Sequence, residues 1–135
     1  MRVLTFLIIS LAISGCASKS MSERADWMVK KVIRKIKLDK MQAAKLWGIK
    51  HKYFEIREGK KKERDGQFNE LLSLIKSQDM SKKEVKDMIA KGRKMQDEYF
   101  PEVFPLVKDF HKSLSQEQKE KVARWLDELR RRFDL

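Results

Sequence analysis

The sequence feature that most constrains the fold is a short helix start near the C-terminus, at Leu114, Ser115 and Gln118. The Ser115 hydroxyl can accept a hydrogen bond from a backbone N–H that would otherwise lack a partner in the first helical turn. Gln118, three residues later, can reach back to the Ser115 amide and complete a capping box. Apolar residues then recur at helical spacing, so the last segment is predicted to be a helix.

The same order of leucine, cap residue and glutamine occurs earlier, at Leu38, Asp39 and Gln42, with aspartate as the cap. Two copies near opposite ends of the helical region predict a shared junction between two helix starts. We therefore expect Gln42 and Gln118 to brace each other across that junction. Replacing both glutamines is then expected to cost more than the sum of the two single losses, because only residues in contact or in one network behave non-additively.

The rest of the chain also predicts helices, because no segment alternates as a strand does. Ser22 is expected to cap the first helix. The second starts at Asp39 and continues through residues 57–67, which contain no apolar side chain and include two glycines. That stretch is either an exposed helix or a local break, because glycine costs about 1 kcal/mol in a helix.

A third capping box, Ser81 with Glu84, begins the longest apolar pattern of the chain. Pro101 and Pro105 lie inside that pattern and each removes a backbone donor. The third helix is therefore expected to bend or break between residues 100 and 105. Four helices of unequal length favour an all-α, open layer over a closed bundle, and an open layer favours self-association.

The N-terminus has the form of an export signal. Arg2 precedes a mostly apolar run over residues 3–13, which is too short to span a bilayer. The run ends in Ile-Ser-Gly-Cys and resembles the lipobox of bacterial lipoproteins, which implies that Cys16 is acylated and becomes the mature N-terminus. Ala17, in place of Asp, implies sorting to the outer membrane. The predicted division is a signal peptide at residues 1–15, a lipidated tether at 16–21 and a helical domain at 22–135.

Charge and cysteine content narrow the functions further. Without Arg2 the mature chain carries 31 basic and 20 acidic side chains, a formal charge of +11. Such a charge attracts acidic proteins and anionic lipid. Nucleic acid is not expected as a partner of an exported lipoprotein. Cys16 is the only cysteine, which excludes an intrachain disulfide and a multi-cysteine metal site.

Catalytic and metal-binding patterns are weak. The chain has no nucleophile elbow, phosphate loop or His-Glu-x-x-His motif, so we expect no enzyme activity and no cofactor. His51 and Glu55 are four residues apart on one helix face, and His111 follows Asp109. Two histidines do not make a cluster, so these three residues remain weak metal candidates and no metal site is predicted.

The paired motif, the export signal, the size and the helical pattern together resemble the Spy/CpxP family of periplasmic stress proteins, which carries a paired LTxxQ motif. The resemblance covers about residues 22–133. Asp39 and Ser115 stand where the family prefers threonine, and both cap a helix equally well. The resemblance implies a curved, cradle-like layer with a long bent third helix, assembled as an antiparallel homodimer.

The function expected from this resemblance is that of a periplasmic, lipid-anchored chaperone that works without ATP and binds unfolding or acidic envelope proteins. Two alternatives stay open within the family: a regulator that docks on and inhibits a two-component sensor kinase, and a relative that senses or resists metal. A third reading, a basic protein of the membrane surface, needs only the anchor and the charge. The residues expected to contact clients are Lys30, Arg34, Lys45, Trp47, Lys52, Phe54, Ile56 and Arg57.

Overall fold

The computed structural model describes residues 20–133, and these residues form five helices joined by short turns. The helices are α2 (Met21–Ile36), α3 (Lys40–Gly59), α4 (Lys61–Lys76), α5 (Lys82–Ser113) and α6 (Gln116–Phe133). The all-helical fold is as predicted. The predicted signal peptide and Cys16 lie outside the described residues.

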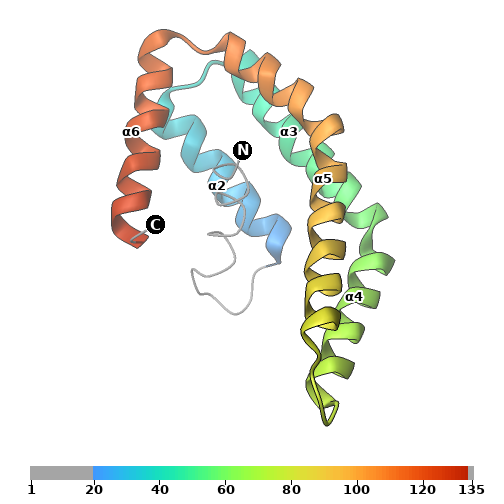
Figure 1. Ribbon diagram of the computed structural model, residues 1–135. Coiled ribbons are helices and arrows are strands. Elements are labelled where there is room, and N and C mark those ends of the chain that lie inside the picture. The colour runs from blue at the N-terminus through green and yellow to red at the C-terminus, as the bar shows by residue number, and fades with distance from the viewer. Residues whose placement is uncertain (1–19, 134–135) are drawn as a thin grey trace.

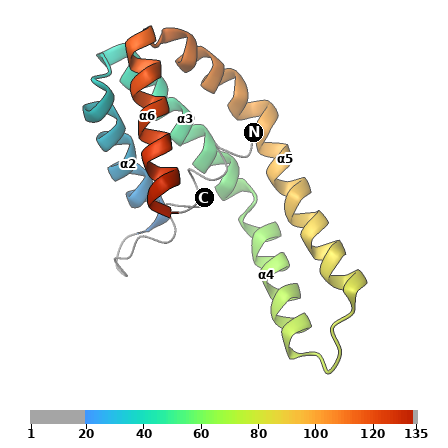
Figure 2. The same cartoon turned by 60° about the vertical axis from the view of Figure 1, so that its left-hand side comes forward.

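The helices form one long hairpin and one short antiparallel helix pair, which meet at one end of the molecule. α3 and α4 run one after the other beside α5 and make the long hairpin, while α2 and α6 lie side by side and make the short pair. α2 also packs against α3, which joins the short pair to the long hairpin. In both views the α4 end of the long hairpin projects beyond α2 and α6 (Figures 1 and 2).

The structure corrects two details of the sequence prediction. Ser20, not Ser22, caps the first helix: its hydroxyl accepts from the Glu23 amide and the Glu23 side chain accepts from the Ser20 amide. The predicted second helix is divided at Lys60, whose φ of −98° and ψ of 11° leave the helical region. This break follows Gly59 and gives five helices instead of four.

The two prolines bend α5 without breaking it. α5 is continuous over 32 residues although Pro101 and Pro105 lie inside it. Its orange C-terminal part turns away from the axis of its yellow N-terminal part (Figure 1). The bend carries the end of α5 over to the start of α6.

The core is small for a chain of this length. Buried apolar side chains come from α2, α5, α6 and the turn before α6. Among residues 20–133 only the Ile36 side chain is almost fully enclosed, at 1% exposure. No helix among residues 20–133 is long and apolar enough to cross a membrane. The buried apolar residues are Val29, Ile36, Met95, Val103, Leu114 and Trp125.

Candidate functional site

The two capping boxes meet where the long hairpin joins the α2/α6 pair, and their glutamines bind each other. The Gln42 side-chain amide donates to Gln118 Oε1, and the Gln118 amide donates to Gln42 Oε1, both at 2.9 Å. Each Oε1 also accepts from a cap amide, that of Asp39 at 3.1 Å and that of Ser115 at 2.9 Å. The cross-brace expected from the repeated motif is therefore present as a reciprocal amide pair.

The same two side chains hold the ends of the preceding helices. Gln42 Nε2 donates to the Ser113 carbonyl at 2.6 Å, and Gln118 Nε2 donates to the Lys37 carbonyl at 3.2 Å. Lys37 is the only non-glycine residue with a positive φ among those described, at 57°, and it ends α2. One part-buried amide pair thus connects the ends of α2 and α5 to the starts of α3 and α6. Its chemistry is structural, because neutral amides neither transfer protons nor carry charge at neutral pH.

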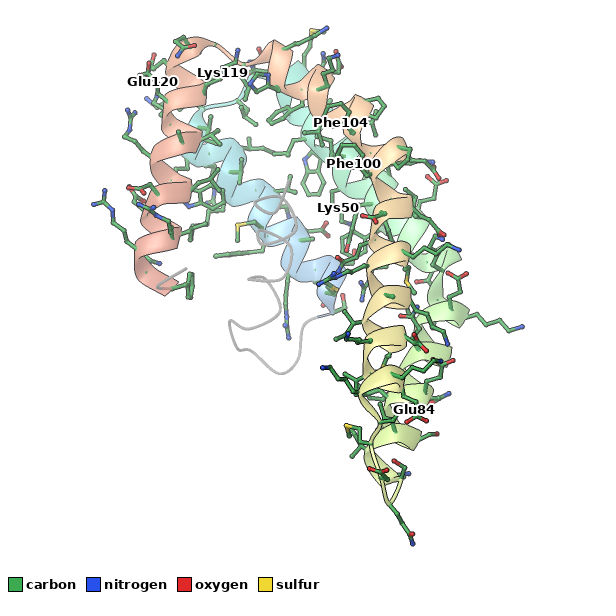
Figure 3. All side chains as sticks on the ribbon, in the orientation of Figure 1. Lys50, Glu84, Phe100, Phe104, Lys119 and Glu120 are labelled. Atoms are coloured by element: carbon green, nitrogen blue, oxygen red, sulfur yellow. The ribbon has the colours of Figure 1, made fainter. Side chains whose placement is uncertain are left out.

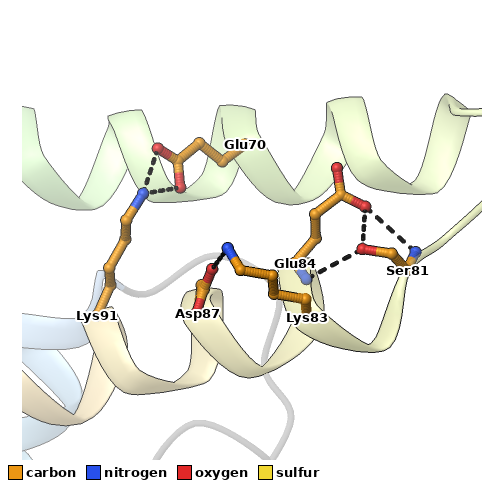
Figure 4. A network of polar contacts seen from close by, with 6 residues as sticks. All are labelled: Glu70, Ser81, Lys83, Glu84, Asp87 and Lys91. Carbon is orange, nitrogen blue, oxygen red and sulfur yellow. Dashed lines mark hydrogen bonds and ion pairs between the residues drawn. The ribbon is translucent and has the colours of Figure 1, made fainter.

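One side of the long hairpin carries a ladder of ion pairs. On α5 the partners recur at spacings of seven, four and seven residues, which places them on one stripe of the helix. Figure 4 shows the rung farthest from the junction, beside the Ser81–Glu84 cap of α5. The pairs are Lys45–Asp109 (2.8 Å), Lys52–Glu102 (3.0 Å), Lys60–Glu98 and Lys91–Glu70 (2.9 Å between Nζ and the nearer carboxylate oxygen).

Hydrogen bonds within the ladder favour the charged forms of Lys52, Lys60 and Glu98. A hydrogen bond to Glu102 raises the pKa of Lys52, and a hydrogen bond to Glu98 raises the pKa of Lys60. The bond from Lys60 in turn lowers the pKa of Glu98. These groups are open to solvent, so the ladder mainly sets the register of α5 against α3 and adds little to stability.

The opposite side of the long hairpin is apolar and uncovered. We call it the hairpin face and define it by six large side chains that are 37% to 59% exposed. At about 100° of rotation per residue, all six point roughly 140–180° away from the Glu70 or Lys91 position on their own helix. These residues are Phe68, Leu72 and Ile75 of α4 with Ile89, Phe100 and Phe104 of α5.

α2 covers this side from the junction as far as Lys50 of α3. Lys50 Nζ lies 2.9 Å from Asp26 and 2.9 Å from the Ser22 hydroxyl, in the N-terminal part of α2, and it lies over the Phe54 ring. Phe100 and Phe104 stack with ring centroids 4.9 Å apart. Figure 3 places both rings on the side of α5 where α2 and α6 lie. From these rings toward the α4 end, no helix of residues 20–133 lies over the hairpin face.

Positive charge borders the hairpin face. A shallow, open depression on α5 includes Ile89 and is lined mainly by charged side chains. Lys86, Arg93 and Lys94 outnumber its one acidic residue, Asp97. The hairpin face is therefore an apolar surface with a basic edge.

The eight residues that were expected to contact clients do not form one surface in the structure. Lys45 and Lys52 belong to the ion-pair ladder on the other side of the hairpin. Lys30 and Arg34 are exposed on α2, away from the hairpin face. The remaining four are partly buried on α3; they are Trp47, Phe54, Ile56 and Arg57.

Sequence reasoning missed the hairpin face although the signal was present. Apolar residues at positions 68, 71, 72, 74 and 75 cover more than one face of a helix. Only Leu71 and Leu74 point toward α5, which leaves the others without a partner. Apolar residues between positions 43 and 56 likewise cover more than one face of α3.

The weak metal candidates do not come together. Within residues 20–133 no group of three or more His, Cys, Asp or Glu side chains is arranged to hold a metal ion. Glu55 instead accepts from Lys52 at 3.5 Å, and His51 lies beside Trp47 with ring centroids 6.0 Å apart. His111 is exposed near the end of α5.

The comparisons with known proteins add no relative to this description. The chain matches no protein-family model. Searches of curated proteins and of solved structures find no match either.

Proposed function

We propose that this protein is an ATP-independent chaperone of the bacterial periplasm that holds partly unfolded envelope proteins on the hairpin face. One observation carries the proposal: six large apolar side chains lie exposed on one side of the long hairpin, beside a basic edge. Large apolar side chains exposed in number on one side of a protein are typical of interaction sites.

The mechanism follows from the two parts of the surface. Positive charge accelerates encounter with acidic or unfolded segments, and this effect weakens as salt rises. Apolar contact then holds the client, at about 25 cal/mol per Å² of apolar area removed from water. The hairpin face is open rather than enclosed, so a client buries only part of this area and can dissociate to fold.

The setting of this activity comes from the sequence. Lipidation at Cys16 and sorting by Ala17 would anchor the chain at the outer membrane, facing the periplasm. The paired motif supports a Spy/CpxP-like chaperone, with a cradle-shaped antiparallel dimer as the working form. The basic surface also suits the alternative role of docking on an acidic sensor domain.

The direct test replaces the exposed rings and the isoleucine farthest from the junction. A variant with Phe68, Ile75, Phe100 and Phe104 all changed to serine should suppress aggregation of a thermally denatured enzyme several-fold less than wild type does. Light scattering without nucleotide measures this. The matched control is Met41→Ser with Phe133→Ser, which removes exposed apolar side chains outside the hairpin face.

Three results bear on the proposal. Loss of activity in the first variant with retention in the control supports it, provided that circular dichroism shows equal helix content. Equal activity in all three proteins contradicts the hairpin face as the binding site. No activity in wild type contradicts the chaperone proposal, and capture of an isolated sensor domain by wild type would then favour the regulatory role.

A further inference from the structure

α2 has a third sector that neither of its helical neighbours covers. Asp26 and Lys50 mark the sector facing α3, and Lys35 and Glu128 mark the sector facing α6. At about 100° per residue, the remaining sector carries Trp27 and three basic side chains. We call it the basic face of α2, and its members are Trp27, Lys30, Lys31 and Arg34.

The cations of this face differ from the lysines that connect two helices. Lysines that connect two helices pair with carboxylates, as Lys35 does with Glu128 at 3.0 Å. Within residues 20–133, no ion pair involves Lys30, Lys31 or Arg34. Arg34 donates from Nε to the Lys30 carbonyl at 3.4 Å, which leaves its terminal nitrogens available. The face therefore presents positive charge that the fold does not neutralise.

Trp27 lies among these cations and is 49% exposed. Lys31 Nζ lies 4.8 Å from the centroid of its ring. A half-exposed tryptophan flanked by lysine and arginine is the combination found where helices lie on a bilayer surface, because the ring is amphipathic and the long basic side chains reach headgroups. Glu23 lies at the N-terminal end of the same sector, where its carboxylate caps the helix through the Ser20 amide.

We propose that the basic face of α2 lies on an anionic membrane surface, with Trp27 at the headgroup level and Lys30, Lys31 and Arg34 against phosphate-bearing headgroups. Charge complementarity selects this occupant, since each such cation adds measurably to attraction by an anionic bilayer. Position supports it too. If Cys16 carries the proposed lipid, α2 begins five residues from the membrane anchor, a span of at most ~18 Å at 3.6 Å per residue. The inference does not depend on chaperone activity.

The test uses residues 17–135, which contain every described helix and lack the acylation site. Wild type is mixed with vesicles of phosphatidylcholine, with or without phosphatidylglycerol, and binding is measured by co-sedimentation. We expect binding to the anionic vesicles only, weakening as salt rises. Lys30→Glu, Lys31→Glu and Arg34→Glu together should weaken it at least about tenfold.

The matched control reverses three exposed charges on α4, with Lys61→Glu, Lys62→Glu and Lys76→Glu. It has the same net charge as the α2 variant, so equal weakening in both would show attraction by net charge alone and overturn the proposal. Equal binding of wild type to both kinds of vesicle would overturn it too. So would a wild type that binds soluble polyglutamate and no vesicle.

Tryptophan fluorescence gives a second readout that does not depend on the triple variant folding. Brominated phosphatidylglycerol should quench emission of the wild type. Trp27→Leu should remove most of that quenching, because Trp125 is buried and Trp47 is partly buried on α3. Quenching that persists unchanged in Trp27→Leu would show that another surface meets the membrane.

Discussion

At the scale of single residues, glutamine is the side chain that the junction requires. An amide offers two donors and a carbonyl acceptor, so one side chain can close its own cap, bond its partner and hold a distant carbonyl. Gln42 does all three while only 7% exposed. A buried polar group must be fully bonded, which ties the two helix starts to each other.

The reciprocal geometry predicts the sign of the coupling between Gln42 and Gln118. Each single alanine variant removes one glutamine's own bonds and leaves one N–H and one acceptor position of the other amide unpaired, so each should cost about 1–3 kcal/mol of unfolding free energy. The double variant removes both amides and should cost less than the sum, with a difference of about 0.5–3 kcal/mol. The repeated motif alone predicted the opposite sign, with the double variant losing more stability than the two single variants summed. Urea unfolding of the three variants measures it, and additive losses would mean that the pair is not formed in solution.

A second residue-scale prediction concerns Cys16, because the proposed lipid anchor depends on this one thiol. Wild type expressed in a bacterial host should incorporate a labelled fatty acid, and Cys16→Ser should not. Absence of label in the wild type would end the lipoprotein assignment. The vesicle experiment above omits this residue, so its outcome is independent.

At the scale of the helix, the prolines of α5 act together. Pro101 and Pro105 are four residues apart and both exposed, so they lie on the same outer side of the helix. Each ring crowds the carbonyl four residues before it, and the helix relieves the clash by bending away from the proline side. Two bends in one direction turn α5 toward the core and deliver Leu114 to its buried position.

Gly66 offers a test of how α4 is held. It lies inside α4 without a positive φ, and a Cβ added there would meet no atom within 4 Å. Gly66→Ala should therefore raise the unfolding free energy by about 0.5–1 kcal/mol, since alanine has less backbone freedom to lose. Urea unfolding measures the change. Gly59→Ala, at the end of α3, is the comparison and should gain less, because terminal helical positions contribute less. A loss of stability in Gly66→Ala would mean that α4 adopts another conformation in solution.

At the scale of the whole molecule, the fold leaves one side of its long hairpin without a layer. The long hairpin extends beyond the α2/α6 pair, so the pair cannot enclose all of it, and the apolar residues beyond α2 stay exposed. Such surface is covered by a client, by a second copy of the chain, or by each in turn.

We expect the chain without lipid to be a dimer at micromolar concentration. Burial of apolar surface between two copies provides the driving force, and C2 dimers are the commonest closed assemblies. Sedimentation velocity over a concentration series measures the mass. A monomer at every soluble concentration would contradict the dimer, and it would leave the hairpin face free for clients.

Capping could be predicted from the sequence because it is local. Asp39 with Gln42, Ser81 with Glu84, and Ser115 with Gln118 each form their box over three residues, and all three helices begin where predicted. The first helix was misplaced because Ser20 and Ser22 compete locally and Glu23 favours Ser20.

Pairing between distant residues was decided only by the tertiary structure. From the sequence, Lys45 was expected to be a cation available to clients. In the structure its Nζ lies 2.8 Å from the Asp109 carboxylate, which the bend of α5 brings close. Phe68 belongs to an apolar pattern, but it stays exposed because the long hairpin extends beyond α2. Helical periodicity indicates that one face of a helix is apolar, and a capping motif indicates where a helix starts. What covers that face depends on the lengths and bends of helices far away in the sequence, and those are properties of the packed chain.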